Sequence, residues 1–295
     1  MGFGETSAQT IVLDKAAKKT YTVREMQSPP KINLYYINMD SAVARREAAE
    51  RQALSHGLDI QRVSAVIGRE LTESDLVGFD AARRRKEYHF DMTKGEHACT
   101  MSHLKALRQF LESDADMGVV LEDDFELHPR FKEGLRWAVE HTGGWQVLKL
   151  FTEDGKLFPT PVESADGNWR LVFPKKLLWI AVGYLYTREG ARRVLEGFRR
   201  YWMPFDAQLA EVMLRGDITV CGIAPSLATT SDPQHQTSSI DASSKESGQG
   251  SRVEVMANTG RRSLCQYIRW RLGIWAVSRS KWRMRRNLRR RLLAK

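Results

Sequence analysis

The chain has 295 residues, of which 42% are apolar and 28% charged, so it can bury the core of one large domain or two small ones. Its formal net charge of +10 comes from one end: residues 261–295 hold 13 of the 46 Lys and Arg and none of the 36 Asp and Glu, so residues 1–260 carry −3. The three cysteines are far apart and form no CxxC pair, which argues against a disulfide framework or a zinc site of that type and favours a reducing compartment.

The first 30 residues have no continuous apolar region, so we do not expect an ordinary secretory signal there. They close on Ser28-Pro29-Pro30, which predicts a boundary between an N-terminal extension, 1–30, and the body of the protein. No run of 18 apolar residues occurs, so no membrane span is predicted.

The body opens with a β-α-β unit. Lys31 to Asp40 is typical of a strand with a polar end, and Ile60 to Val66 of a second strand. Ser41 is the expected N-cap of the helix between them, and Gly57 marks its expected end. Because parallel strands need such a crossover, this order predicts an α/β fold with a parallel sheet.

Residues 69–94 are highly charged, which predicts an excursion outside the core. A helix is expected to start near Gly95, with leucines at helical spacing, and to lead into the apolar strand from Gly118 to Leu121. Beyond this strand, the pattern predicts a strand at 145–151 and a turn-rich stretch at 155–176. Two helices are expected next, one capped by Thr187 and a short one opened by 203–206. A strand at 218–223 and a loop or linker at 229–260 follow.

Three consecutive acids, Glu122, Asp123 and Asp124, follow the apolar strand directly. Like charges beside a buried strand repel one another and lose hydration, so a positive partner is expected there. Ligands of open α/β sheets bind at the carboxyl ends of strands, and carboxylate oxygens suit Mg²⁺ or Mn²⁺. The alternative is a strand followed by an exposed acidic turn.

The order of several motifs resembles glycosyltransferase family 25, the lipooligosaccharide-type galactosyltransferases related to the collagen galactosyltransferases. The motifs span roughly residues 31–240 and are Ile37-Asn38-Met39-Asp40 with Arg45-Arg46, GEHACTMSHL from Gly95 to Leu104, LEDD from Leu121 to Asp124, Gly183-Tyr184-Leu185-Tyr186 with Gly190-Ala191, Pro204-Phe205-Asp206, and Ser239-Ile240. Met39 and His97 depart from the family's usual residues, and residues 1–30 and the basic tail lie outside the match. The resemblance implies a nucleotide-sugar donor and a GT-A-like, Rossmann-related fold.

A divalent cation, Mn²⁺ or Mg²⁺, is the natural electrophile for a departing diphosphate. With the family in mind, Asp124 is the expected direct ligand, while Asp123 or Glu122 would act through water or hold the ribose hydroxyls. His235 is a candidate third ligand, since enzymes of this architecture often use a late histidine. The alternative is that His235 is an incidental loop residue.

The expected donor-binding residues lie at the strand ends and on the predicted helices. Asp40 would receive the nucleoside, and Arg45 or Arg46 its phosphates, because guanidinium matches phosphate oxygens; a solvated helix face is the alternative. The remaining expected donor-binding residues are Asn38, Glu96, Ser102, His103, Glu122, Asp123 and Gly183. Ser102 and His103 have an alternative as hydrogen-bonded core partners.

Known members of the family invert the anomeric centre, which requires a carboxylate to take the proton of the acceptor hydroxyl. Asp206 is the candidate base, with Glu153 and Asp154 as alternatives; Asp206 could instead cap the helix at 207–213.

The sequence therefore predicts a catalytic domain at 31–240, a linker at 241–260 and a basic tail at 261–295. The expected activity is metal-dependent transfer of a sugar, galactose from UDP-galactose, onto a lipid-linked glycan of the lipooligosaccharide or lipopolysaccharide type. Two alternatives stay open: a nucleotidyl or phosphoryl transferase that uses the same acids, and a non-catalytic protein that binds a membrane surface.

The tail carries three tryptophans among its arginines, Trp270, Trp275 and Trp282. Indole rings favour the membrane interface, so we expect the tail to bind an anionic membrane rather than nucleic acid. This predicts a cytoplasmic protein held on the inner face of the cytoplasmic membrane.

Overall fold

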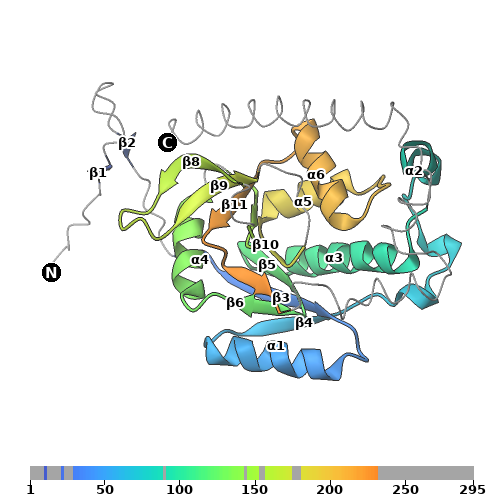
Figure 1. The fold of residues 1–295 in the computed structure, drawn as a ribbon, viewed down its shortest axis with the longest axis horizontal. Helices are drawn as coiled ribbons and strands as arrows, with labels where there is room; N and C mark the ends of the chain where they lie inside the picture. Colours follow the sequence, from blue (N-terminus) through green and yellow to red (C-terminus); the bar gives the residue numbers. More distant parts are fainter. Residues whose placement is uncertain are drawn as a thin grey trace, which may run out of the picture.

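The computed structural model describes residues 10–11, 21–22, 29–88, 91–142, 145–152, 157–174 and 181–231. Its centre is an eight-stranded sheet in the order β4-β3-β5-β10-β7-β11-β9-β8 (Figure 1). Strands β9 and β10 run against the other six. The strands are β3 (Ile32–Asn38), β4 (Ile60–Ser64), β5 (Met117–Glu122), β7 (Val147–Lys149), β8 (Leu157–Glu163), β9 (Arg170–Pro174), β10 (Gly183–Thr187) and β11 (Val220–Ala224).

Two smaller sheets pair β1 (Thr10–Ile11) with β2 (Tyr21–Thr22), and β6 (Phe125–Leu127) with β12 (Ala228–Thr230). The helices are α1 (Val43–Ser55), α2 (Ala81–Tyr88), α3 (Lys94–Glu112), α4 (Phe131–Glu140), α5 (Arg188–Gly197) and α6 (Phe205–Arg215), with short 3₁₀ turns at Gly68–Glu70 and Glu73–Asp75. Helices α3, α5 and α6 gather on one side of the sheet, and α1 lies on the other (Figure 1). This confirms the predicted α/β class and is consistent with a GT-A-like architecture.

The predicted β-α-β opening is confirmed, since β3 and β4 are parallel neighbours joined by α1. Gly57 follows the helix with a positive φ of 59°, a conformation that glycine adopts without strain. The prediction that Ser41 caps α1 was wrong: Ala42 is the N-cap and no side chain caps the helix. The first turn instead begins next to the polar end of β3, where Asn38 donates to the Ala42 carbonyl.

The long helix α3 begins with a capping box. The Thr93 side chain accepts from the Glu96 backbone, and the Glu96 carboxylate accepts from the Thr93 backbone, so both groups satisfy donors at the helix start. Further along, α3 packs closely on β5, because a Cβ at Gly118 would lie 2.6 Å from the Phe110 ring. The predicted Thr187 cap of α5 is also confirmed, by a 2.9 Å bond from the Gly190 amide.

Two predictions about the connecting segments need correction. The stretch at 155–176, expected to be turn-rich, contains the antiparallel pair β8–β9, which extends the sheet beyond β11. Residues 69–94 lie outside the sheet, as expected, but they are not simply solvated. Arg84 of α2 is 2% exposed, and Arg83 stacks over the Trp202 ring at 4.2 Å, so this segment docks beside α6.

Candidate active site

Polar and charged residues meet at one edge of the sheet. The carboxyl ends of β3, β5 and β7 lie there together with the amino end of β10, because β10 is antiparallel to its neighbours. Gly183 opens β10 opposite Leu121, and a Cβ on it would lie 2.6 Å from the Leu121 side chain. The close approach of β5 and β10 therefore explains a glycine at position 183; its expected contact with a donor stays a prediction.

The three acids after β5 point to different partners. Glu122 lies 3.3 Å from the Nε2 atom of His103 on α3. Asp123 contacts Asn38 and Arg45. Asp124 accepts from Thr230 at the end of β12. The triplet is therefore not a solvated acidic turn, because each carboxylate meets a different element of the fold.

Asp123 joins the first strand and the first helix to the acidic turn. Its Oδ2 accepts from Asn38 at 2.7 Å, and its Oδ1 from the Arg45 guanidinium at 2.9 Å. The Asp123 side chain is 11% exposed, so this ion pair is largely withdrawn from water. Asn38, Arg45 and Asp123, which were predicted separately, thus lie side by side.

Asp40 has a partner that the sequence did not indicate. Its carboxylate pairs with Arg62 of β4 and accepts from Ser64 at 2.9 Å, and these contacts lower the pKa of this exposed acid. Arg62 also donates from Nε to the Asn38 side chain at 3.0 Å. Arg46, by contrast, is half-buried, and its charge acts on Tyr36 of β3.

Asp124 is the acid that best fits a bound cation. Burial raises its pKa, with further contributions from the charges of Glu122 and Asp123, while Thr230 opposes the shift with a 2.7 Å hydrogen bond. Its Oδ1 atom is buried and has no hydrogen-bond partner within the described residues. A desolvated carboxylate oxygen with no donor is the kind of ligand that a hard divalent ion takes, so Asp124 suits Mg²⁺ or Mn²⁺.

The polar residues of α3 divide into two groups. Glu96 belongs to the capping box. Ser102 bridges the helix to the segment that follows β4, because it accepts from the Val66 amide at 2.8 Å and donates to the Ala98 carbonyl. Their predicted contact with the donor stays a prediction. His103, which is 1% exposed, instead reaches the acidic turn, and its ring stacks on Phe205 at 4.1 Å.

A buried lysine, missed from the sequence, completes the cluster. Lys149 ends β7 and is 5% exposed; burial lowers its pKa to about 8, while the charges of Asp206 and Glu122 oppose that shift. Those two carboxylates also act on Cys99 and on Tyr184, whose pKa values burial raises well above their usual range.

Asp206 lies in the first turn of α6 rather than at its N-cap, which is Pro204. Lys149 could have been identified from the sequence, because it is the one charged residue in the apolar run from Val147 to Phe151.

The remaining candidates, Glu153, Asp154, His235, Ser239 and Ile240, lie outside the described residues, as does the basic tail. Among the helices that the structure describes, no segment is both long and apolar enough to cross a membrane.

The acids lie at the edge where open α/β sheets bind their ligands, and comparison with known proteins shows which family the chain belongs to. The family model of glycosyltransferase family 25 (LPS biosynthesis protein) matches residues 31–209. Because this is more than half of the chain, the protein belongs to glycosyltransferase family 25.

Curated proteins that resemble this chain support the same family assignment. A glycosyltransferase 25 family member of Anopheles gambiae is 28% identical over 177 residues, which are 55% of this chain and 28% of the relative. Procollagen galactosyltransferase 1-B of Xenopus laevis is 28% identical over 170 residues, again 55% of this chain and 28% of the relative. Procollagen galactosyltransferase 2 of Homo sapiens is 22% identical over 170 residues, 55% and 27% of the two chains. The match thus spans less than a third of these relatives.

Proposed function

We propose that this glycosyltransferase transfers galactose from UDP-galactose, with a divalent cation, to a glycan acceptor of the lipopolysaccharide or lipooligosaccharide type. The observation that carries the metal-dependent part is the Oδ1 atom of Asp124 at the carboxyl edge of the sheet, which is buried and has no hydrogen-bond partner among the residues that the structure describes. The description of the family supports the acceptor, and the name of the Xenopus relative, a procollagen galactosyltransferase, supports the sugar.

Each residue around Asp124 has a different proposed role in donor binding. A bound Mn²⁺ or Mg²⁺ would supply positive charge to the diphosphate as it leaves. Asp123, fixed by Asn38 and Arg45, orients the acidic turn toward the donor. Asp40 lies on the exposed rim of the same edge, fixed by Arg62, where it can accept from the hydroxyls of a ribose.

Asp206 is the proposed general base of an inverting transfer. A base has to be ionised to take the proton of the acceptor hydroxyl, and an adjacent cation favours the ionised form. Lys149 is that cation, since the charge of Asp206 is the largest influence favouring its protonated state. The buried ammonium and the Asp206 carboxylate attract each other, and in this proposal the lysine favours the ionised form of the base.

We further propose that the tail, 261–295, holds the enzyme on the inner face of the cytoplasmic membrane, beside a lipid-linked acceptor. Its 13 Lys and Arg and its three tryptophans support this location.

A transfer assay tests the proposal. Purified protein is incubated with a panel of nucleotide sugars, with and without Mn²⁺, and the released nucleotide is measured together with the anomeric configuration of the product. We expect UDP-galactose to be the preferred donor, the product to be inverted and EDTA to stop the reaction. Preference for another sugar would overturn the donor assignment, retention would exclude Asp206 as a simple base, and full activity in EDTA would exclude the metal.

A further inference from the structure

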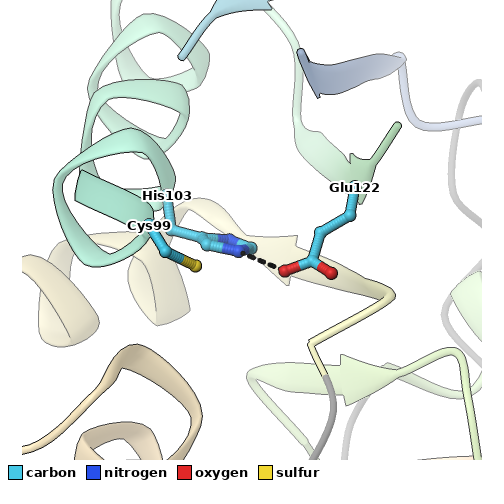
Figure 2. A group of neighbouring side chains, drawn as sticks. All are labelled: Cys99, His103 and Glu122. Carbon is cyan, nitrogen blue, oxygen red and sulfur yellow. Dashed lines mark hydrogen bonds and ion pairs between the residues drawn. The ribbon is translucent and has the colours of Figure 1, made fainter. Parts of the chain in front are cut away.

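A cysteine, a histidine and a glutamate lie together where α3 meets the end of β5. Cys99 and His103 are four residues apart on α3, so both side chains leave the same face of the helix. Glu122 approaches them from the end of β5, and Figure 2 shows the three side chains pointing toward one another. One potential ligand atom from each residue lies within 4.8 Å of those of the other two, and the His103 Nε2 and Glu122 Oε1 atoms are 3.3 Å apart.

These separations are close to those of a metal centre. With bonds of about 2.0–2.3 Å, neighbouring ligand atoms of a tetrahedral zinc site lie about 3.3–3.8 Å apart. The histidine–glutamate distance is already in that range, and the Cys99 sulfur lies within 4.8 Å of both of the other ligand atoms. The donor set also differs from that of Asp124, because sulfur and imidazole favour zinc or cobalt over magnesium.

From this geometry we propose that Cys99, His103 and Glu122 form a site for a thiophilic divalent ion of the Zn²⁺ type, with its fourth position open. The ion joins α3 to the end of β5 and holds Glu122 in place. Its ligands differ from Asp124, the expected ligand of the cation in the proposed transfer reaction, so a signal from the thiolate reports on this site alone.

The surroundings of His103 predict an exchangeable ion rather than a permanent one. Ligand histidines usually donate their second N–H to an acceptor that fixes the ring. Within the described residues, His103 Nδ1 is buried without a hydrogen-bond partner, so the ring is oriented by its Nε2 contact with Glu122 and its stacking on Phe205 and not by an acceptor at Nδ1. We therefore expect a chelator to remove the ion without unfolding the protein.

Cobalt titration of the purified full-length protein tests this inference without any sugar substrate. Cys265 is replaced by serine in every sample, so that the thiol of the tail cannot contribute. We expect one Co²⁺ per chain to produce near-ultraviolet absorption of a cobalt–thiolate bond and visible bands of tetrahedral strength. Zinc should displace the cobalt, and an excess of Mg²⁺ should not.

Matched variants assign the signal. Cys99→Ser should abolish the thiolate band, whereas Cys221→Ser, which removes the buried thiol of β11, should leave it unchanged. Glu122→Gln, at a partly exposed position, should keep the fold and weaken zinc binding by more than about 100-fold, since loss of an outer partner alone costs about 10–100-fold. Asp124→Asn should keep the band. A band that persists in Cys99→Ser, or no thiolate band in the parent protein, would overturn the proposal.

Discussion

Lys149 is an ammonium group placed among apolar side chains at the end of β7. It is 5% exposed, and its burial lowers its pKa to about 8 although Asp206 and Glu122 favour the charged form. At pH values below 8 the folded chain keeps this charge out of water, while the unfolded chain hydrates it. The energetic cost is relieved as the pH rises from 8 toward the ordinary lysine pKa of about 10.4, because the folded chain then releases its proton first.

We predict that the wild type gains stability relative to Lys149→Met as the pH rises from 8 to about 10.4. The difference between their unfolding free energies should change by about 3 kcal/mol, because one pKa unit corresponds to about 1.4 kcal/mol. Urea unfolding at several pH values measures the difference, in which the other titrating groups largely cancel. Lys105→Met, at an exposed position of α3, is the matched control and should show no such trend. A difference that stays flat or falls with pH would contradict the buried charge.

Asp206→Asn should lower turnover by about 10²–10⁴-fold, the usual contribution of a general base, while leaving donor affinity within a few-fold of wild type. Steady-state kinetics and calorimetric donor binding separate the two effects. Glu211→Gln, a carboxylate on the same helix that pairs with Arg83, controls for a general effect on α6. If turnover of Asp206→Asn is nearly unchanged, the base lies elsewhere, and Glu153 and Asp154 become the candidates to test.

At the residue scale, the sequence predicted which residues belong to the site but not which side chain contacts which acid. Asn38, Arg45 and the triplet could be chosen because strand ends and family motifs mark them. Arg62 could not, because its contact with Asp40 depends on the register of β3 and β4, in which Tyr36 lies opposite Arg62 and Asn38 opposite Ser64. Register is set by packing between segments distant in sequence, and residue type alone does not reveal it.

At the element scale, local signals predicted the helices and strands best. The cap of α5 and the start of α3 follow from short-range hydrogen bonds, which depend on a few neighbouring residues. The β8–β9 hairpin was missed because Pro159 and Pro161 interrupt its first strand and the intervening turn is rich in polar residues. Prolines are tolerated at a sheet edge, and β8 is one of the two edge strands of the central sheet.

The contact between α3 and β5 positions both His103 and the acidic turn. This close packing requires a glycine at position 118, because a side chain there would meet α3. Gly118→Ala should reduce the unfolding free energy by about 1–3 kcal/mol, because its Cβ would meet the buried Phe110 ring at 2.6 Å. Denaturant unfolding measures this loss. Adding Phe110→Leu makes room for the new methyl group, so the double variant should lose less than the sum of the two single variants. Strict additivity would mean that the two residues are not in contact.

At the scale of the whole molecule, the chain combines a nearly neutral body, residues 1–260, with a strongly basic end, residues 261–295. Each Lys or Arg near an anionic membrane contributes about 1 kcal/mol, attenuated by salt, so engagement of even part of the tail would hold the protein on a bilayer. The three tryptophans of the tail add an interfacial contribution that salt does not weaken.

Flotation with liposomes tests the role of the tail. Full-length protein should float with anionic vesicles and not with neutral ones, and added salt should weaken binding. A chain ended at Gly260 should stay unbound while it still hydrolyses the donor. Equal flotation of the two proteins would show that the tail is not the membrane-binding segment.

We propose that Asp124 provides the cation site on which donor binding depends, and calorimetry of UDP-galactose binding tests this role. The wild type should bind the donor tightly with Mn²⁺ and weakly in EDTA, whereas Asp124→Asn should bind weakly in both. Asp114→Asn, an exposed acid paired with Lys31, is the control and should behave as the wild type. Donor binding to Asp124→Asn that is as tight and as manganese-dependent as in the wild type would contradict the account.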